Sequence, residues 1–144
     1  MKNVRLLLRE KGADVWSVSP QTSVREAVRI LAEKNIGALL VMDGGRLVGI
    51  LSERDTARKM ILQSLPADTT PVSQIMTTHV ITITPEYTIQ ECMALMTDRR
   101  VRHLPVMEGD QLAGIISIGD VVKEIIADQE FTIQHLERYI TGER

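Results

Sequence analysis

Two short polar motifs with the same spacing are the residues best suited to bind a ligand. Each reads Gly-x-x-Ser-x-x-Asp and follows an apolar run typical of a strand. The Ser and Asp are therefore expected at the start of a helix, where free backbone N–H groups and the positive dipole end attract phosphate. A carboxylate in the first helical turn can also accept hydrogen bonds from two ribose hydroxyls. The motif residues are Gly49, Ser52 and Asp55, and Gly114, Ser117 and Asp120.

The same spacing also suits a purely structural role. A serine at a helix N-cap accepts a hydrogen bond from a backbone N–H, and an acidic residue three positions later can return one. Ser52 with Asp55, and Ser117 with Asp120, satisfy that pattern without any ligand. The motif alone leaves capping and binding open.

The two motifs belong to an internal repeat. Residues 15–61 align with residues 80–126 without a gap, at a constant offset of 65 residues. Apolar, turn and polar positions match together, which is the signature of a duplicated structural unit. The identical pairs are Val15/Val80, Pro20/Pro85, Glu26/Glu91, Leu39/Leu104, Val41/Val106, Met42/Met107, Gly44/Gly109, Leu47/Leu112, Gly49/Gly114, Ile50/Ile115, Ser52/Ser117, Asp55/Asp120 and Ile61/Ile126.

Each repeat is predicted to be β-α-β-β-α. A short β-rich run, 15–18 or 80–83, ends before a proline, which cannot continue a ladder. A capping-box pair, Ser23 with Glu26 or Thr88 with Glu91, then begins a helix with apolar residues at helical spacing. Two apolar runs around a Gly-containing turn follow, and they predict a hairpin. The motif then leads into a second helix.

The 144 residues thus divide into two half-domains rather than one ordinary domain. A unit of about 50 residues buries a sheet and two helices poorly by itself, so the repeats are expected to pack as a pseudo-twofold pair in an α+β fold. The predicted divisions are an N-terminal helix at 1–12, the first repeat at 13–63, a linker at 64–76, the second repeat at 77–127 and a C-terminal helix at 128–144.

Composition narrows the function classes. Seventeen Lys and Arg against 19 Asp and Glu give a net charge of −2, so no global positive field favours nucleic acid or an anionic membrane. A single cysteine, Cys92, and the lack of a leader-like apolar stretch favour a cytoplasmic protein. The histidines have no metal-ligand spacing, and no nucleophile elbow is present, so neither a metal site nor catalysis is expected.

The motifs also resemble a known family. The segments GILSERD at 49–55, GIISIGD at 114–120 and RVRHLPV at 100–106 are similar to cystathionine β-synthase (CBS) domains, and a tandem pair resembles a Bateman module. This resemblance implies a non-catalytic regulatory module that binds AMP, ADP, ATP, NAD or S-adenosylmethionine in clefts between the copies.

Carried over from that family, each cleft would combine the Ser and Asp of one copy with the first strand of the other. The basic residues make the clefts unequal, because Arg102 and His103 align with Gly37 and Ala38, and Arg54 aligns with Gly119. We expect the first cleft to take the phosphorylated nucleotide. It would contain Ser52, Arg54, Asp55, Val80, Ile81, Thr82, Arg102 and His103. The second would contain Val15, Trp16, Ser17, Gly37, Ala38, Ser117 and Asp120.

The resemblance further implies a homodimer that signals to a regulated partner protein, whose identity the sequence does not reveal. The apolar face of the C-terminal stretch has nothing in the repeats to cover it, which favours pairing with a second chain. Thr56 departs from the family, where an aromatic residue often follows Arg-Asp, so ring stacking on a ligand is in doubt. The alternative is a scaffold protein whose clefts have lost their ligands.

Overall fold

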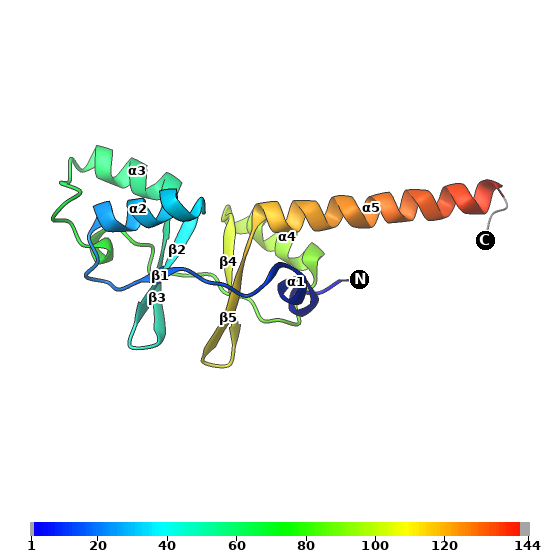
Figure 1. Cartoon of the computed structure of the whole chain (residues 1–144), viewed down its shortest axis with the longest axis horizontal. Coiled ribbons are helices and arrows are strands. Elements are labelled where there is room, and N and C mark those ends of the chain that lie inside the picture. The colour runs from blue at the N-terminus through cyan, green and yellow to red at the C-terminus, as the bar shows by residue number, and fades with distance from the viewer. Residues whose placement is uncertain (1, 142–144) are drawn as a thin grey trace. The chain divides into compact units, whose positions relative to one another are not determined.

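The structure is a computed structural model that describes residues 2–141, and it has the predicted α+β class (Figure 1). The chain forms two compact units. The first-repeat unit comprises Asp14–Ile81 and Gly109–Leu112. The second-repeat unit comprises the residues up to Ala13, Thr82–Glu108 and those from Ala113 onward. The N-terminal helix therefore belongs with the second repeat, although the first repeat follows it in sequence.

The first-repeat unit is a three-stranded sheet with helices α2 and α3. Strand β1 pairs in parallel with β2, which pairs antiparallel with β3. Val24, Ala27 and Leu31 of α2 are buried with Leu39 and Val41 of β2, as the apolar spacing predicts. The elements are β1 (Ser17–Val18), α2 (Val24–Lys34), β2 (Ala38–Asp43), β3 (Arg46–Ser52), α3 (Glu53–Leu62) and a 3-10 turn η1 (Val72–Gln74).

The second-repeat unit has a counterpart of each repeat helix and hairpin strand but no first strand, and it also includes the N-terminal helix. It contains α1 (Val4–Lys11), α4 (Ile89–Arg99), β4 (His103–Glu108), β5 (Gln111–Ser117) and α5 (Ile118–Thr141), and β4 and β5 form a two-stranded sheet. Ile89, Cys92 and Met96 line the buried face of α4, matching the predicted apolar positions.

The strand expected at 80–83 is reduced to one parallel bridge between Ile83 and Val106. In the first repeat, the Leu40 N–H donates to the Trp16 carbonyl and extends the pairing toward the N-terminus. Pro105 occupies the position of Leu40 in the second repeat and has no N–H to donate. The prediction of a full strand at 80–83 was wrong for this reason.

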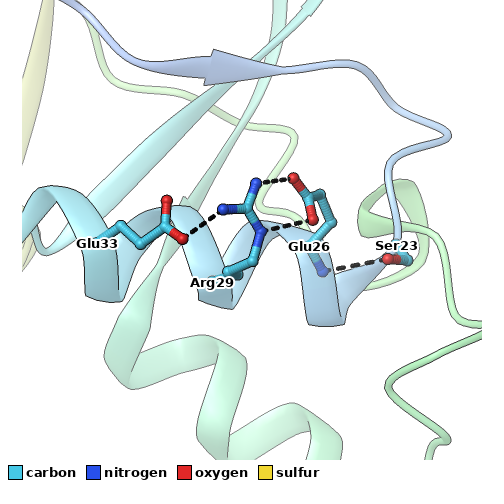
Figure 2. A network of polar contacts seen from close by, with 4 residues as sticks. All are labelled: Ser23, Glu26, Arg29 and Glu33. Carbon is cyan, nitrogen blue, oxygen red and sulfur yellow. Dashed lines mark hydrogen bonds and ion pairs between the residues drawn. The ribbon is translucent and has the colours of Figure 1, made fainter.

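The capping boxes also differ between the repeats. Thr88 and Glu91 form the complete reciprocal box at the start of α4. In α2 the Ser23 Oγ accepts from the Glu26 N–H at 3.1 Å, but the Glu26 carboxylate is paired with Arg29, which also binds Glu33 (Figure 2). The guanidinium lowers the pKa of Glu26 below its ordinary value. The reciprocal box predicted for Ser23 and Glu26 is therefore only half formed, because a charge-assisted pair competes for the carboxylate.

Helix α5 continues without a break through residue 128, where the sequence suggested a separate helix, and extends to Thr141 (Figure 1). Met1 and residues 142–144 of the predicted terminal helices lie outside the described residues. Within residues 2–141, no helix combines the length and apolarity required to cross a membrane.

Candidate functional site

Both Gly-x-x-Ser-x-x-Asp motifs lie where a hairpin strand passes into a helix, as predicted. β3 leads into α3 at Ser52, and β5 leads into α5 at Ser117. The Ser52 Oγ accepts a hydrogen bond from the Asp55 N–H at 3.0 Å, and Ser117 does the same for Asp120 at 3.2 Å. Both serines therefore cap helices, and the structural role considered for them is confirmed.

The start of β2 or β4 lies beside the motif of its own repeat. The Glu53 N–H donates to the Gly37 carbonyl at 2.9 Å, and the Ile118 N–H donates to the Arg102 carbonyl at 2.8 Å. Gly37 and Arg102 thus hold equivalent places at the first turn of the following helix. This local geometry brings Arg102 to the Asp120 motif.

The motif glycines allow close packing of a segment from elsewhere in the chain. A Cβ built on Gly49 would lie 2.5 Å from the Met76 Sδ, and one built on Gly114 would lie 2.8 Å from the Leu8 Cδ2. Met76 follows η1, whereas Leu8 belongs to α1. Each segment precedes one repeat in sequence and packs against the other repeat's motif.

One oxygen of the Asp120 carboxylate is engaged within its unit. Its Oδ2 accepts from the Ser117 N–H at 2.8 Å and from the Lys11 Nζ at 2.6 Å. Lys11 also donates to the Ile115 carbonyl at 2.9 Å. Burial acts to raise the pKa of Asp120, but the hydrogen bonds from Lys11 and Ser117 outweigh it and hold the pKa below its ordinary value of 3.8.

The Asp55 carboxylate has different surroundings from that of Asp120. Its side chain is exposed, and among residues 2–141 it accepts no hydrogen bond and joins no ion pair. Arg54, beside it, is also exposed. The first repeat therefore presents a carboxylate and a cation to solvent at the start of α3.

His103 and Arg102 surround the second motif together with Lys11. Burial lowers the pKa of His103 below its ordinary value, the charge of Asp120 opposes that shift, and Arg102 and Lys11 reinforce it. His103 therefore favours its neutral form near pH 7. The sequence did not predict a role for Lys11, because no pattern links the last turn of α1 to a motif more than 100 residues away.

The other residues predicted to line the clefts lie outside the motifs. Lys34 Nζ lies 4.3 Å from the centre of the Trp16 ring, and Ser17 pairs with Leu40 across the sheet. Ala38 is buried at the start of β2. Val15, Val80 and Ile81 are half-buried, and Thr82 is exposed. Their grouping with a motif of the other repeat remains a prediction.

Among residues 2–141, neither the cysteine nor a cluster of metal-binding side chains forms a further site. Cys92 is buried in α4, and burial, with the charge of Glu91, raises the pKa of its thiol to about 11. A thiol with such a pKa is a poor nucleophile and metal ligand at neutral pH. Within residues 2–141, no three His, Cys, Asp or Glu side chains are grouped to hold a metal ion.

The sequence and the fold were compared with those of known proteins, and the matches agree with a duplicated strand-to-helix motif. The family model for the CBS domain matches residues 11–61 and 72–127. The chain belongs to the CBS domain family. The mitochondrial CBS domain-containing protein CBSX3 of Arabidopsis thaliana is 40% identical over 136 residues, which cover 91% of this chain and 66% of CBSX3.

Solved CBS structures agree with the fold. A candidate signal-transduction protein with CBS domains from Burkholderia ambifaria is 46% identical, with a TM-score of 0.85 over 89% of this chain and 96% of that chain. The hexameric CBS-CP12 protein of bloom-forming cyanobacteria is 25% identical, with a TM-score of 0.75 over 85% of this chain and 70% of that one. Oligomeric CBS proteins therefore exist, and CBS-pair proteins of this kind are typically non-catalytic.

Proposed function

We propose that this CBS pair is a regulatory module that binds an adenine nucleotide and signals to a partner protein. The observation that carries this proposal is the exposed Asp55 carboxylate at the start of α3, which has no partner among residues 2–141. Ser52 already caps the helix, so the carboxylate is not needed for capping and is available to two ribose hydroxyls. CBS domains are known as binders of adenosyl ligands, which supports this reading of an unpaired acidic side chain.

The phosphate groups would be bound by the basic residues. Arg54 lies next to Asp55 at the helix N-terminus, where the dipole also favours an anion. Arg102 lies at the other motif, where its exposed guanidinium can contact the phosphate of a nucleotide bound at Asp120 in a bidentate manner. AMP, ADP and ATP are therefore the first ligands to test, with NAD and S-adenosylmethionine as adenosyl alternatives.

Calorimetry and thermal unfolding with these five ligands test the proposal. A ligand at a hundredfold excess over its dissociation constant stabilises a folded protein by about 2.7 kcal/mol, which raises the melting temperature measurably. Asp55→Asn removes the charge and should weaken binding at least about tenfold, since hydrogen bonds to charged groups contribute about 1.5–3 kcal/mol. Its stability without ligand should change little.

Asp43→Asn is the matched control, because Asp43 is an exposed carboxylate at the hairpin end of β2. It should bind like the unmodified protein. If none of the five ligands binds or shifts the melting temperature, the nucleotide function is refuted and the scaffold alternative is favoured.

We also propose that α5 pairs with α5 of a second copy. Ile126, Ile133, Leu136 and Ile140 are 49%, 55%, 54% and 81% exposed. With Gln129 they follow spacings of three and four residues along one side of the helix, which is the seam of a two-stranded coiled coil.

The polar residues of α5 favour a parallel pair. A parallel arrangement places Gln129 opposite Gln129 of the second copy, where the two amides can bind each other. An antiparallel arrangement would bury Gln129 against Leu136 and bring Glu130 close to Glu137, so like charges would meet.

Cross-linking tests the orientation. Gln129→Cys should form a disulfide-linked dimer under mild oxidation, whereas Asp128→Cys, one residue away from the seam, should not. Native Cys92 is buried and does not compete. A monomeric mass by light scattering, or no cross-link at position 129, would contradict the parallel dimer.

A further inference from the structure

The contact between Lys11 and Asp120 joins α1 to the second motif. Both side chains are partly buried, at 31% and 24% exposure. Lys11 Nζ uses two of its three donors here, one on the Asp120 Oδ2 and one on the Ile115 carbonyl. The ammonium is therefore held by two elements, rather than resting on the surface as a single exposed ion pair.

Helix α1 is fixed in the position that brings Lys11 to the motif. Asn3 caps the helix and bridges to Thr88, and the Val4 N–H donates to the Tyr87 carbonyl at 2.8 Å. Leu8 packs on Gly114, and Lys11 lies three residues later on the same side of the helix. The packing of α1 therefore sets the register of Lys11.

In the first repeat, the carbonyl equivalent to that of Ile115 receives its hydrogen bond from a backbone N–H rather than from a lysine. Ile50 aligns with Ile115, and its carbonyl accepts from the backbone N–H of Thr77 at 2.9 Å. The segment around Thr77 is extended after the short η1, so it supplies backbone where α1 supplies a lysine side chain. Nothing equivalent to Lys11 contacts Asp55 among the described residues.

We infer that Lys11 determines which motif accepts a nucleotide first, by occupying the Asp120 carboxylate and leaving Asp55 as the higher-affinity ribose site. This inference rests on the nucleotide-binding function proposed above. The Asp120 Oδ2 already accepts from Ser117 and Lys11, so a ribose diol meets only one unoccupied oxygen, Oδ1. Binding of one hydroxyl to each carboxylate oxygen requires Lys11 to leave.

Displacement of Lys11 also links the second motif to α1. Once a ribose replaces the ammonium, the last turn of α1 loses its attachment to Asp120 and Ile115. Occupation of this motif would therefore loosen the C-terminal end of α1, which connects directly to the first repeat through Gly12.

Titration with AMP by calorimetry in an Asp55→Asn background tests the inference, because the remaining binding then reports the Asp120 motif. Adding Lys11→Met keeps the aliphatic stem and removes the charge. It should tighten AMP binding about fivefold, the effect expected from removing an ion pair of moderate strength. Adding Arg9→Met, which changes an exposed cation in the same turn, should leave the affinity unchanged.

The outcomes separate this inference from the proposed function. Weaker or unchanged AMP binding in the Lys11→Met variant would overturn it while leaving the nucleotide function intact, and weaker binding would make Lys11 a phosphate ligand instead. AMP binding by none of the proteins, unmodified protein included, would overturn both. As a second readout, hydrogen exchange of the Leu7–Lys11 amides should accelerate when the unmodified protein is saturated with AMP, and unchanged exchange would contradict displacement.

Discussion

Asp55 and Asp120 occupy the same position of two copies of one motif, but their surroundings differ. Asp55 is exposed and unpaired among the described residues, whereas Asp120 accepts from Ser117 and Lys11. The serines perform the same capping role in both repeats, so the difference lies in the acidic side chain. A duplicated motif therefore does not guarantee two equal sites, because residues outside the repeat decide which carboxylate is free.

The cores of the two repeats should be equally sensitive to truncation. Leu39 and Leu104 align, lie in β2 and β4, and are both fully buried. Leu39→Ala and Leu104→Ala should each lower the free energy of unfolding by about 3 kcal/mol, through lost transfer energy and a residual cavity. Urea denaturation measures both. A loss below about 1 kcal/mol in one variant would show that its repeat contributes little to the stable core.

The motif glycines should also be intolerant of a side chain, and Gly49 more so than Gly114. The new Cβ at Gly49 would approach Met76 Sδ, Cγ and Cβ, whereas at Gly114 it meets the ends of the Leu8 side chain. Gly49→Ala should cost about 2 kcal/mol and Gly114→Ala less, as expected for overpacking. Thermal unfolding provides the comparison. Equal and negligible losses would refute the close-packing role of both glycines.

Replacing Asp55 or Asp120 with Asn should change the free energy of unfolding by different amounts, even without a ligand. Asp120→Asn breaks the pair with Lys11 and should lower the free energy of unfolding by about 1 kcal/mol, whereas Asp55→Asn should change it by less than about 0.5 kcal/mol. Because the native pKa of Asp120 lies below 3.8, its contribution is complete above that pH and disappears as the pH falls through the native pKa. The difference between Asp120→Asn and the unmodified protein should therefore shrink below about pH 4, and a constant difference would contradict the ion pair.

The smallest expected difference in stability between the repeats concerns the residue that follows each motif Asp. Thr56 is buried with its hydroxyl unpaired among the described residues, and the aligned Val121 is fully buried. Thr56→Val should raise the free energy of unfolding by about 1 kcal/mol, because it removes a buried polar group without a partner and retains the shape. Thermal unfolding would reveal the gain. A loss of stability would indicate that the hydroxyl has a partner.

The repeat, the strand-to-helix placement of the motifs and the capping serines follow from local sequence, and the structure confirms them. They were predictable because helix caps, apolar periodicity and turn residues act over a few positions. The loss of most of the strand at 80–83 was also predictable in principle from Pro105. This proline lies in β4, however, and its effect is on the segment that pairs with β4. Glu26 shows a similar limit, since Arg29 competes for a carboxylate that the motif pattern assigns to the cap.

By itself, the amino-acid sequence determined that this protein contains two CBS repeats, where each motif lies and that each serine begins a helix. Only the tertiary structure decided which motif carboxylate lacks a partner among the described residues. The reason is that Lys11 reaches Asp120 through the packing of Leu8 on Gly114, and such a contact depends on how segments far apart in the chain fold together. Charge pairing between distant residues leaves no periodic pattern in the sequence, so the difference between the two motif carboxylates is visible only in the folded chain.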